Sequence, residues 1–147
     1  MNYASLLAAD LFDVDATIVV TAGEPAAFVG EDCPTVWIWV SRIEDAALFQ
    51  AGCAVRSTVT VSYRVDACYT EVDGEIPAAT HETDEAAFLS LVSDVWCTLV
   101  AAKDDGTLLG LGDCDLAVLS PLVVGQRQGG VVSASGAVVA DFDCLAS

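Results

Sequence analysis

The stretch Ala54–Val65 constrains the fold of this 147-residue chain more than any other segment. Its apolar residues alternate with polar ones over most of its length, the apolar set being Val55, Val59, Val61, Tyr63 and Val65. Because successive side chains of a strand point to opposite faces, this alternation predicts a strand with one face in the core and one face open. A half-exposed strand of this kind is typical of an antiparallel or mixed sheet.

Two helices are predicted around this strand. Asn2 is a good N-cap, and the apolar residues after it have helical spacing, which predicts a short helix ending near Phe12. A longer helix is predicted to begin at Thr83, as its N-cap, and to end at Gly106. Its apolar positions form the stripe of a helix that lies on a sheet, namely Phe88, Leu91, Val92, Val95, Leu99 and Val100.

The remaining segments predict further strands and loops. Strands are expected over 16–21 and 35–40, followed by a loop from Ile43 to Gly52 with a helical turn at Glu44–Phe49. The last third is expected to form a hairpin at 115–144 with a glycine-rich turn. The predicted fold is α+β: a mostly antiparallel sheet of four to five strands, packed by an N-terminal helix and one long central helix. No repeat or linker divides residues 1–147, so a single domain is expected, with a long loop at 68–82.

The segment 35–40 is apolar on both faces, since Val36, Ile38 and Val40 alternate with Trp37 and Trp39. We therefore expect this strand to be buried on both sides, or to be covered by a neighbouring subunit. Trp37 and Trp39 are candidate subunit-interface residues.

The composition indicates that apolar surface is left over after folding. Hydrophobic residues make up 54% and charged residues 18% of the chain, against roughly 45–50% and about 25% in typical globular domains. The longest apolar run, 86–102, is short for a membrane span and contains Asp94. We therefore expect no membrane segment, and no signal peptide because Met1–Ser5 lacks basic residues. We expect the excess apolar surface to be buried in a subunit interface.

The net charge of −17, from 22 acidic and five basic residues, excludes one class of function. Proteins grip nucleic acid by neutralising phosphates with Lys and Arg, and five bases cannot do much of this. An acidic surface instead repels DNA, so a pore lined by it would let DNA slide through without binding.

The six cysteines form no CxxC pair, which argues against a zinc site or a thioredoxin-type motif. The simplest interpretation is that they are small buried side chains in a reducing cytoplasm. One or two disulfides are the alternative, and Cys33 and Cys68, near strand ends, are the first candidates.

No catalytic, cofactor-binding or metal-binding residues are predicted. The single histidine, His81, is expected in an exposed loop, and no GxSxG motif surrounds any serine. Asp141 and Asp143 share a face of their strand and are the type of pair that binds calcium or serves a glycosidase. With 22 acidic residues such pairs arise by chance, and none fits an EF-hand. No phosphate-binding or dinucleotide-binding loop is present either.

The order of the segments resembles the tail-terminator and neck proteins of long-tailed phages that infect actinobacteria. An N-terminal helix leads to Glu31–Val40 (EDCPTVWIWV), and a strand beginning at Cys53 contains Val59–Cys68 (VTVSYRVDAC). An acidic loop, a helix with Asp84 and Glu85 in its first turn, and a Gly-Gly hairpin follow. The resemblance covers most of residues 1–144.

The resemblance implies a ring, usually of six subunits, on the head-proximal end of the tail tube. Its expected partners are copies of itself, the tail tube protein and the head–tail connector or stopper, with DNA passing through. It implies a place in the virion after assembly in the host cytoplasm. Candidate contact residues in the long loop and the hairpin tip are Glu71, Asp73, Glu75, Arg127, Gly129 and Gly130.

Two other classes of function remain open on sequence alone. One is a different virion subunit, such as a head–tail stopper, a tail tube protein or a capsid decoration protein. The other is a small hydrolase or ligand-binding domain, for which His81 would be the first residue to test.

Overall fold

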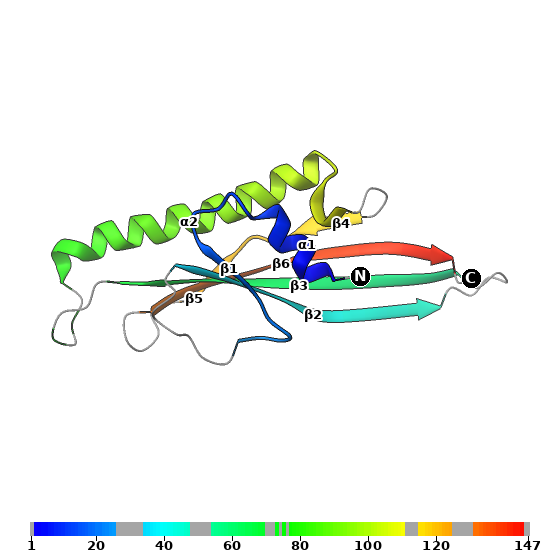
Figure 1. The fold of residues 1–147 in the computed structure, drawn as a ribbon, viewed down its shortest axis with the longest axis horizontal. Coiled ribbons are helices and arrows are strands. Elements are labelled where there is room, and N and C mark those ends of the chain that lie inside the picture. The colour runs from blue at the N-terminus through cyan, green and yellow to red at the C-terminus, as the bar shows by residue number, and fades with distance from the viewer. Residues whose placement is uncertain are drawn as a thin grey trace.

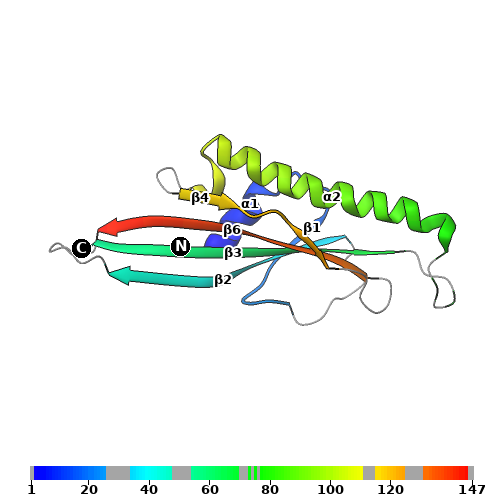
Figure 2. The same ribbon diagram turned by 180° about the vertical axis from the view of Figure 1, so that it is seen from behind.

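The computed structural model of the chain describes residues 2–25, 34–47, 54–69, 73, 75, 77–110, 115–124 and 131–145, with the backbone alone at 45–47, 54–57, 123–124 and 142–145. The elements in chain order are α1 (Tyr3–Asp10), β1 (Thr17–Val20), β2 (Thr35–Ala47), β3 (Ala54–Cys68), α2 (Ala78–Asp104), the 3-10 turn η2 (Leu108–Gly110), β4 (Asp115–Val118), β5 (Leu122–Val124) and β6 (Val131–Leu145). One sheet carries both helices on the same face, with α2 along its length (Figures 1 and 2). The predicted α+β class is confirmed.

The strand order is β1-β2-β3-β6-β4, and β5 also pairs with β6. Only β1 and β2 are parallel, so the sheet is mostly antiparallel, as predicted. β4 and β5 follow one another along the same edge of β6, because β3 occupies the other edge along its full length. Pro121, which has no N–H to donate, lies between them, and the pairing shifts by one residue there. The predicted hairpin at 115–144 is therefore present, whereas its turn lies outside the described residues.

The loop and helical turn predicted at Glu44–Phe49 are wrong as far as Ala47, because β2 continues to that residue. Beyond a bulge between Val40 and Arg42, the second half of β2 pairs with β3 up to Ala47 opposite Val55. Glu44 to Ala47 favour a helix locally, but the long-range ladder to β3 outweighs this preference.

Helix α1 begins as predicted, with the Asn2 side chain accepting a hydrogen bond from the Ser5 N–H at 3.2 Å. At the other end of the helix, Asp10 Oδ2 accepts from the Leu109 N–H at 2.8 Å. Leu109 has a φ of +56° and a buried side chain, so this bond holds a strained turn against the core. Burial raises the pKa of Asp10, and the bond from Leu109 opposes the rise.

Helix α2 begins at Ala78, so the predicted N-cap Thr83 is wrong. Pro77 is the N-cap; its fixed φ suits a helix start, and its carbonyl accepts the N–H groups of Thr80 and His81. The predicted inner stripe is confirmed, since its buried members are Phe88, Leu91, Val92, Val95 and Leu99.

The centre of the core is an aromatic ring placed over a glycine. Tyr63 on β3 is fully buried and pairs with Gly136 on β6. A Cβ atom at Gly136 would lie 2.8 Å from Tyr63 Cε1 and closer still to Cζ and Oη. Among the described residues the Tyr63 hydroxyl has no hydrogen-bond partner, and burial raises its pKa to about 12. The glycine thus makes the room that this side chain needs.

We expect Gly136→Ala to lower the free energy of unfolding by about 1–3 kcal/mol, because the added methyl overlaps the Tyr63 ring. The matched control is Gly23→Ala, where a Cβ meets nothing within 4 Å; its cost should stay below about 0.5 kcal/mol. Urea unfolding measures both. In a Tyr63→Leu background the cost of Gly136→Ala should largely vanish; an equal cost in both backgrounds would show that the ring is not the cause.

Candidate functional site

The sheet face turned away from the helices carries a buried ion pair. Arg64 is 2% exposed and Asp66 is fully buried. Arg64 Nε donates to Asp66 Oδ1 and Oδ2 at 3.0 and 3.1 Å, and Nη2 donates to Oδ2 at 2.8 Å. Ser133 Oγ donates to Asp66 Oδ1 at 2.6 Å, and Arg64 Nη1 donates to the Pro25 carbonyl at 3.1 Å. The pair therefore joins β3 to β6 and to the segment after β1, and its two charges cancel.

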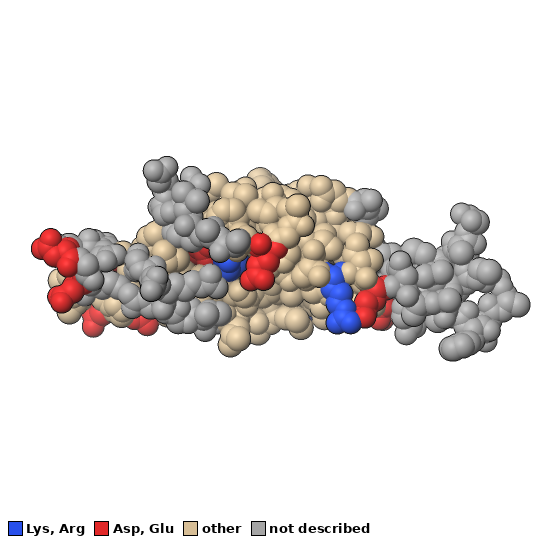
Figure 3. Space-filling model, turned by 90° about the horizontal axis from the view of Figure 1, so that it is seen from below, with Lys and Arg blue, Asp and Glu red and all other residues tan. Residues whose placement is uncertain are grey.

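The rest of this face is uncharged in its middle and carries carboxylates towards one end, where Asp141 is paired with Thr58 on β3 and with the exposed Asp115 on β4. Its half-buried described members are Trp37, Thr58, Thr60, Ser62, Ser135, Ala137, Val139 and Asp141, and we call this set the open sheet face. Three hydroxyl groups at this face donate hydrogen bonds: Ser62 Oγ donates to Ser41 Oγ at 2.7 Å, Ser41 Oγ donates to the Thr60 carbonyl, and Thr58 Oγ1 donates to Asp141 Oδ1 at 3.4 Å. Figure 3 shows uncharged atoms over most of the described middle of this face. Near its end lies the exposed ion pair Arg42–Glu44.

The two tryptophans predicted as interface residues differ in exposure. Trp39 is only 8% exposed, so its own subunit already covers it. Trp37 is half-buried and contributes to the open sheet face, while its Nε1 is buried without a hydrogen-bond partner in the described part of the chain. Contact with a neighbouring subunit stays a prediction for both residues.

The other predicted contact residues are only partly described. Asp73 and Glu75 are exposed, and Asp73 has a φ of +54°. Glu71, Arg127, Gly129 and Gly130 lie outside the described residues.

A second uncharged surface runs along α2 and was not predicted. The exposed members of what we call the outer ridge are Ala86, Leu89, Ser90, Ser93, Trp96 and Cys97. Leu89 and Trp96 stand out, with exposed fractions of 45% and 37%. The signal in the sequence is a second set of residues three and four apart, at 86, 89, 93 and 96, beside the inner stripe.

The ridge explains an unusual property of α2. Taken with the turn that follows it, the segment Ala78–Gly110 is long and apolar enough to cross a membrane, with a mean hydropathy of 1.5 in its most apolar window. Only 28% of that window is buried against the sheet. The helix therefore has one apolar stripe for its own core and another that the described part of the chain does not cover.

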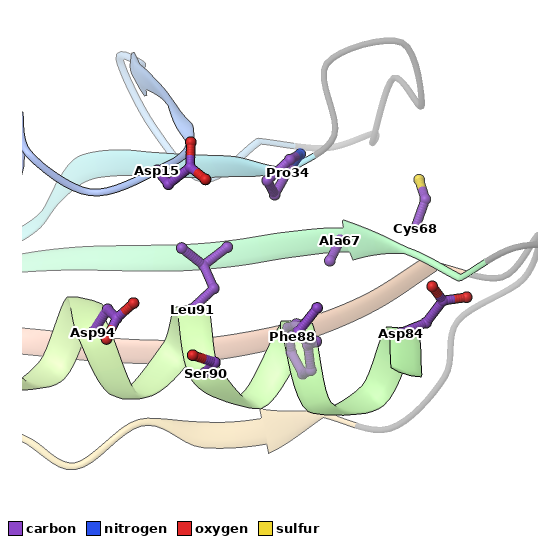
Figure 4. A pocket seen from close by; sticks show the side chains of 10 residues that line it. Asp15, Pro34, Ala67, Cys68, Asp84, Phe88, Ser90, Leu91 and Asp94 are labelled. Carbon is purple, nitrogen blue, oxygen red and sulfur yellow. The ribbon is translucent and has the colours of Figure 1, made fainter. Parts of the chain in front are cut away.

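A cavity of about 440 Å³ lies between the first half of α2 and the sheet (Figure 4). Ala67, Phe88 and Leu91 give it apolar walls, and its three carboxyl groups come from Asp15, Asp84 and Asp94. No histidine lines it, and nowhere in the described chain do three or more His, Cys, Asp or Glu side chains cluster as metal ligands. The described lining thus supplies carboxyl groups and apolar contacts, without a histidine.

His81 lies in the first turn of α2, so the expectation of a loop histidine is wrong. Its Nδ1 is 3.5 Å from Glu85 Oε2, one helical turn further on, and its ring meets the Tyr69 ring edge-on at 5.2 Å. Burial, followed by the charges of Glu85 and Asp84, raises the pKa of Tyr69. The contacts with Glu85 and Tyr69 give His81 a structural role at the start of α2.

Two cysteines contradict the simplest interpretation of the sequence. Cys68 is exposed and disulfide-bonded, and Cys97 is a free thiol exposed on the outer ridge. The alternative, that Cys68 forms a disulfide, is therefore confirmed. Its predicted partner, Cys33, lies outside the described residues.

No protein-family model matches this chain, and a comparison with curated proteins finds no match.

We expect Asp66→Asn to lower the free energy of unfolding by about 3–5 kcal/mol, because it leaves the buried Arg64 charge uncompensated. Glu44→Gln is the matched control. It breaks the exposed Arg42–Glu44 pair and should cost less than about 1 kcal/mol. Urea unfolding compares the two variants, and equal costs would contradict a buried-charge penalty at Asp66. The double variant Arg64→Met/Asp66→Val should cost less than Asp66→Asn alone.

We expect Cys68→Ser to lower the free energy of unfolding by about 2–4 kcal/mol under non-reducing conditions, because the unfolded chain loses a cross-link. In excess reductant the two proteins should differ by much less. Peptide mapping without reduction identifies the partner, which the sequence predicts to be Cys33. Cys97→Ser is the control and should change neither the map nor the stability.

Proposed function

We propose that this chain is a structural subunit that assembles into a closed ring. We further propose that the ring, a hexamer, caps the head-proximal end of a phage tail tube and joins it to the head connector. The open sheet face carries the first part of the proposal, and the sequence resemblance to tail-terminator and neck proteins supports the second.

The argument from the open sheet face is electrostatic. Copies that each carry a net charge of −17 repel one another, so they can associate only where the contact surfaces are free of uncompensated charge. The described middle of the open sheet face meets this condition, since Arg64 is neutralised by Asp66. Ser62, Ser135 and Ala137 in this middle part are also small enough to let another surface pack closely.

Several of the described acidic residues lie on the helices. Helix α2 alone bears Glu82, Asp84, Glu85, Asp94 and Asp104, against one basic residue, Lys103. A ring that turned such a surface towards its lumen would let DNA pass along an acidic wall without holding it. This agrees with the shortage of basic residues, which argues against a DNA-binding role.

Other virion subunits would use the same kind of surface. A tail tube protein, a head–tail stopper and a capsid decoration protein are the alternatives, and their modes of growth separate them. A tube protein adds copies without limit, a decoration protein binds the shell, and a terminator stops at one ring on one end of the tube.

We expect the purified chain to form a closed oligomer of one size by native mass measurement. Electron-microscope images of a mixture with tail tubes should show it at one end only. Open-ended growth would favour a tube protein. A monomer that ignores the tubes at all concentrations would overturn the proposal.

A pair of variants tests whether the open sheet face makes the contact. Ala137→Glu places one carboxylate in the middle of this face, whereas Ala9→Glu adds the same charge at an exposed position of α1. A buried unpaired charge costs about 3 kcal/mol or more, which corresponds to about a 100-fold weaker association. We expect this loss for Ala137→Glu only, with circular dichroism confirming that both variants are folded. Equal assembly of the two variants would exclude the face as the contact.

A further inference from the structure

The outer ridge of α2 and the open sheet face lie on opposite sides of the molecule, and neither is covered by the described part of its own chain (Figures 1 and 3). We propose that they bind each other between copies: the outer ridge of one subunit packs on the open sheet face of the next. This inference rests on the proposed ring and assigns its two contact surfaces.

The first argument is the chemistry of the ridge. Ala86, Leu89, Ser93 and Trp96 recur at intervals of three and four residues, the same spacing by which the inner stripe packs on its own sheet. The helix thus carries two stripes suited to a sheet, and only one of them has a sheet within the subunit. A second copy supplies the other.

The second argument is charge. Between Glu82 and Asp104 the outermost positions of α2 are uncharged, but Glu85 and Asp94 flank the ridge on its two sides. Packing two ridges together would bring these carboxylates of both helices close to one another, which is unfavourable. Packing the ridge on the open sheet face places them beside a surface whose buried charges cancel. Charge therefore favours ridge on face over ridge on ridge.

The third argument is fit. The outer ridge, from Ala86 to Cys97, extends about 17 Å along the helix. The open sheet face extends about 20 Å along β6, from Ser135 to Asp141. The two surfaces are therefore of similar length. Packing two open faces on each other would leave both apolar ridges bare.

The pairing decides the type of assembly. Contact between two different surfaces is heterologous, so an open chain of copies has a free ridge at one end and a free face at the other until it closes on itself. A closed ring satisfies both surfaces of every subunit. Contact between identical surfaces would stop at a dimer instead.

The native thiol Cys97 on the ridge allows a direct test, because Ser62 lies near the middle of the open sheet face. Assembled Ser62→Cys protein is treated with a short bifunctional maleimide, and the linked peptides are identified by mass spectrometry. We expect links between positions 97 and 62 of different copies, giving a ladder from dimer up to the full ring. Ala137→Cys, on the neighbouring strand, is a second variant that should give the same ladder.

The controls separate this inference from the proposed ring. Ser62→Cys/Cys97→Ser should give no ladder alone, but should link to the wild-type chain when the two are mixed before assembly. Dimers of the wild type through Cys97 alone, or of the control through position 62 alone, would overturn the inference in favour of contact between identical surfaces. An oligomer without any 97–62 or 97–137 link would also overturn it while leaving the ring intact. A monomer by native mass would instead overturn the ring.

Discussion

The pairing of β3 with β6 is the interaction on which the rest of the structure depends. It runs without interruption from Ala54 opposite Leu145 to Cys68 opposite Val131. β2 extends the sheet on one side of this pair, while β4 and β5 extend it on the other. The pairing also sets Tyr63 over Gly136 and brings Ser133 to Asp66. Because every residue on these strands is fixed to one face or the other, the same register builds an apolar core beneath the helices and, on the far side, a surface that is uncharged in its middle.

The two sides of the sheet carry different kinds of side chains. Helix α2 carries five acidic residues, whereas the middle of the open sheet face holds Trp37 and hydroxyl and small apolar side chains beside a buried ion pair. A strongly acidic protein can stay dissolved and still associate in a defined orientation when its contact surfaces are kept neutral in this way. The outer ridge of α2 is the exception on the helix side, since it is apolar where its surroundings are acidic.

Much of the fold could be predicted because its signals are periodic. The alternation in β3 indicated a covered and an open face, and the inner stripe of α2 indicated a helix on a sheet. The second half of β2 could not be predicted, because its residues favour a helix locally and only the distant partner β3 makes them a strand. The start of α2 was missed because Pro77 begins the helix without the side-chain cap that Thr83 seemed to offer. For the candidate site, the alternation in β3 predicted the open sheet face. The outer ridge was not predicted, because only one apolar stripe was considered for α2.

The distance in sequence between β3 and β6 has a consequence for folding. β2 and β3 are neighbours in the chain, and the contacts within α2 are local, so these parts can form early. The pairing of β3 with β6 closes a long loop that contains the whole of α2, and it can therefore form only later. Sheets that depend on such distant pairings fold slowly. The residues Ser135, Ala137 and Val139 of the open sheet face arrive only with β6. A partly folded chain therefore lacks the open sheet face, so in the proposed ring only subunits that have completed the sheet could make the contact.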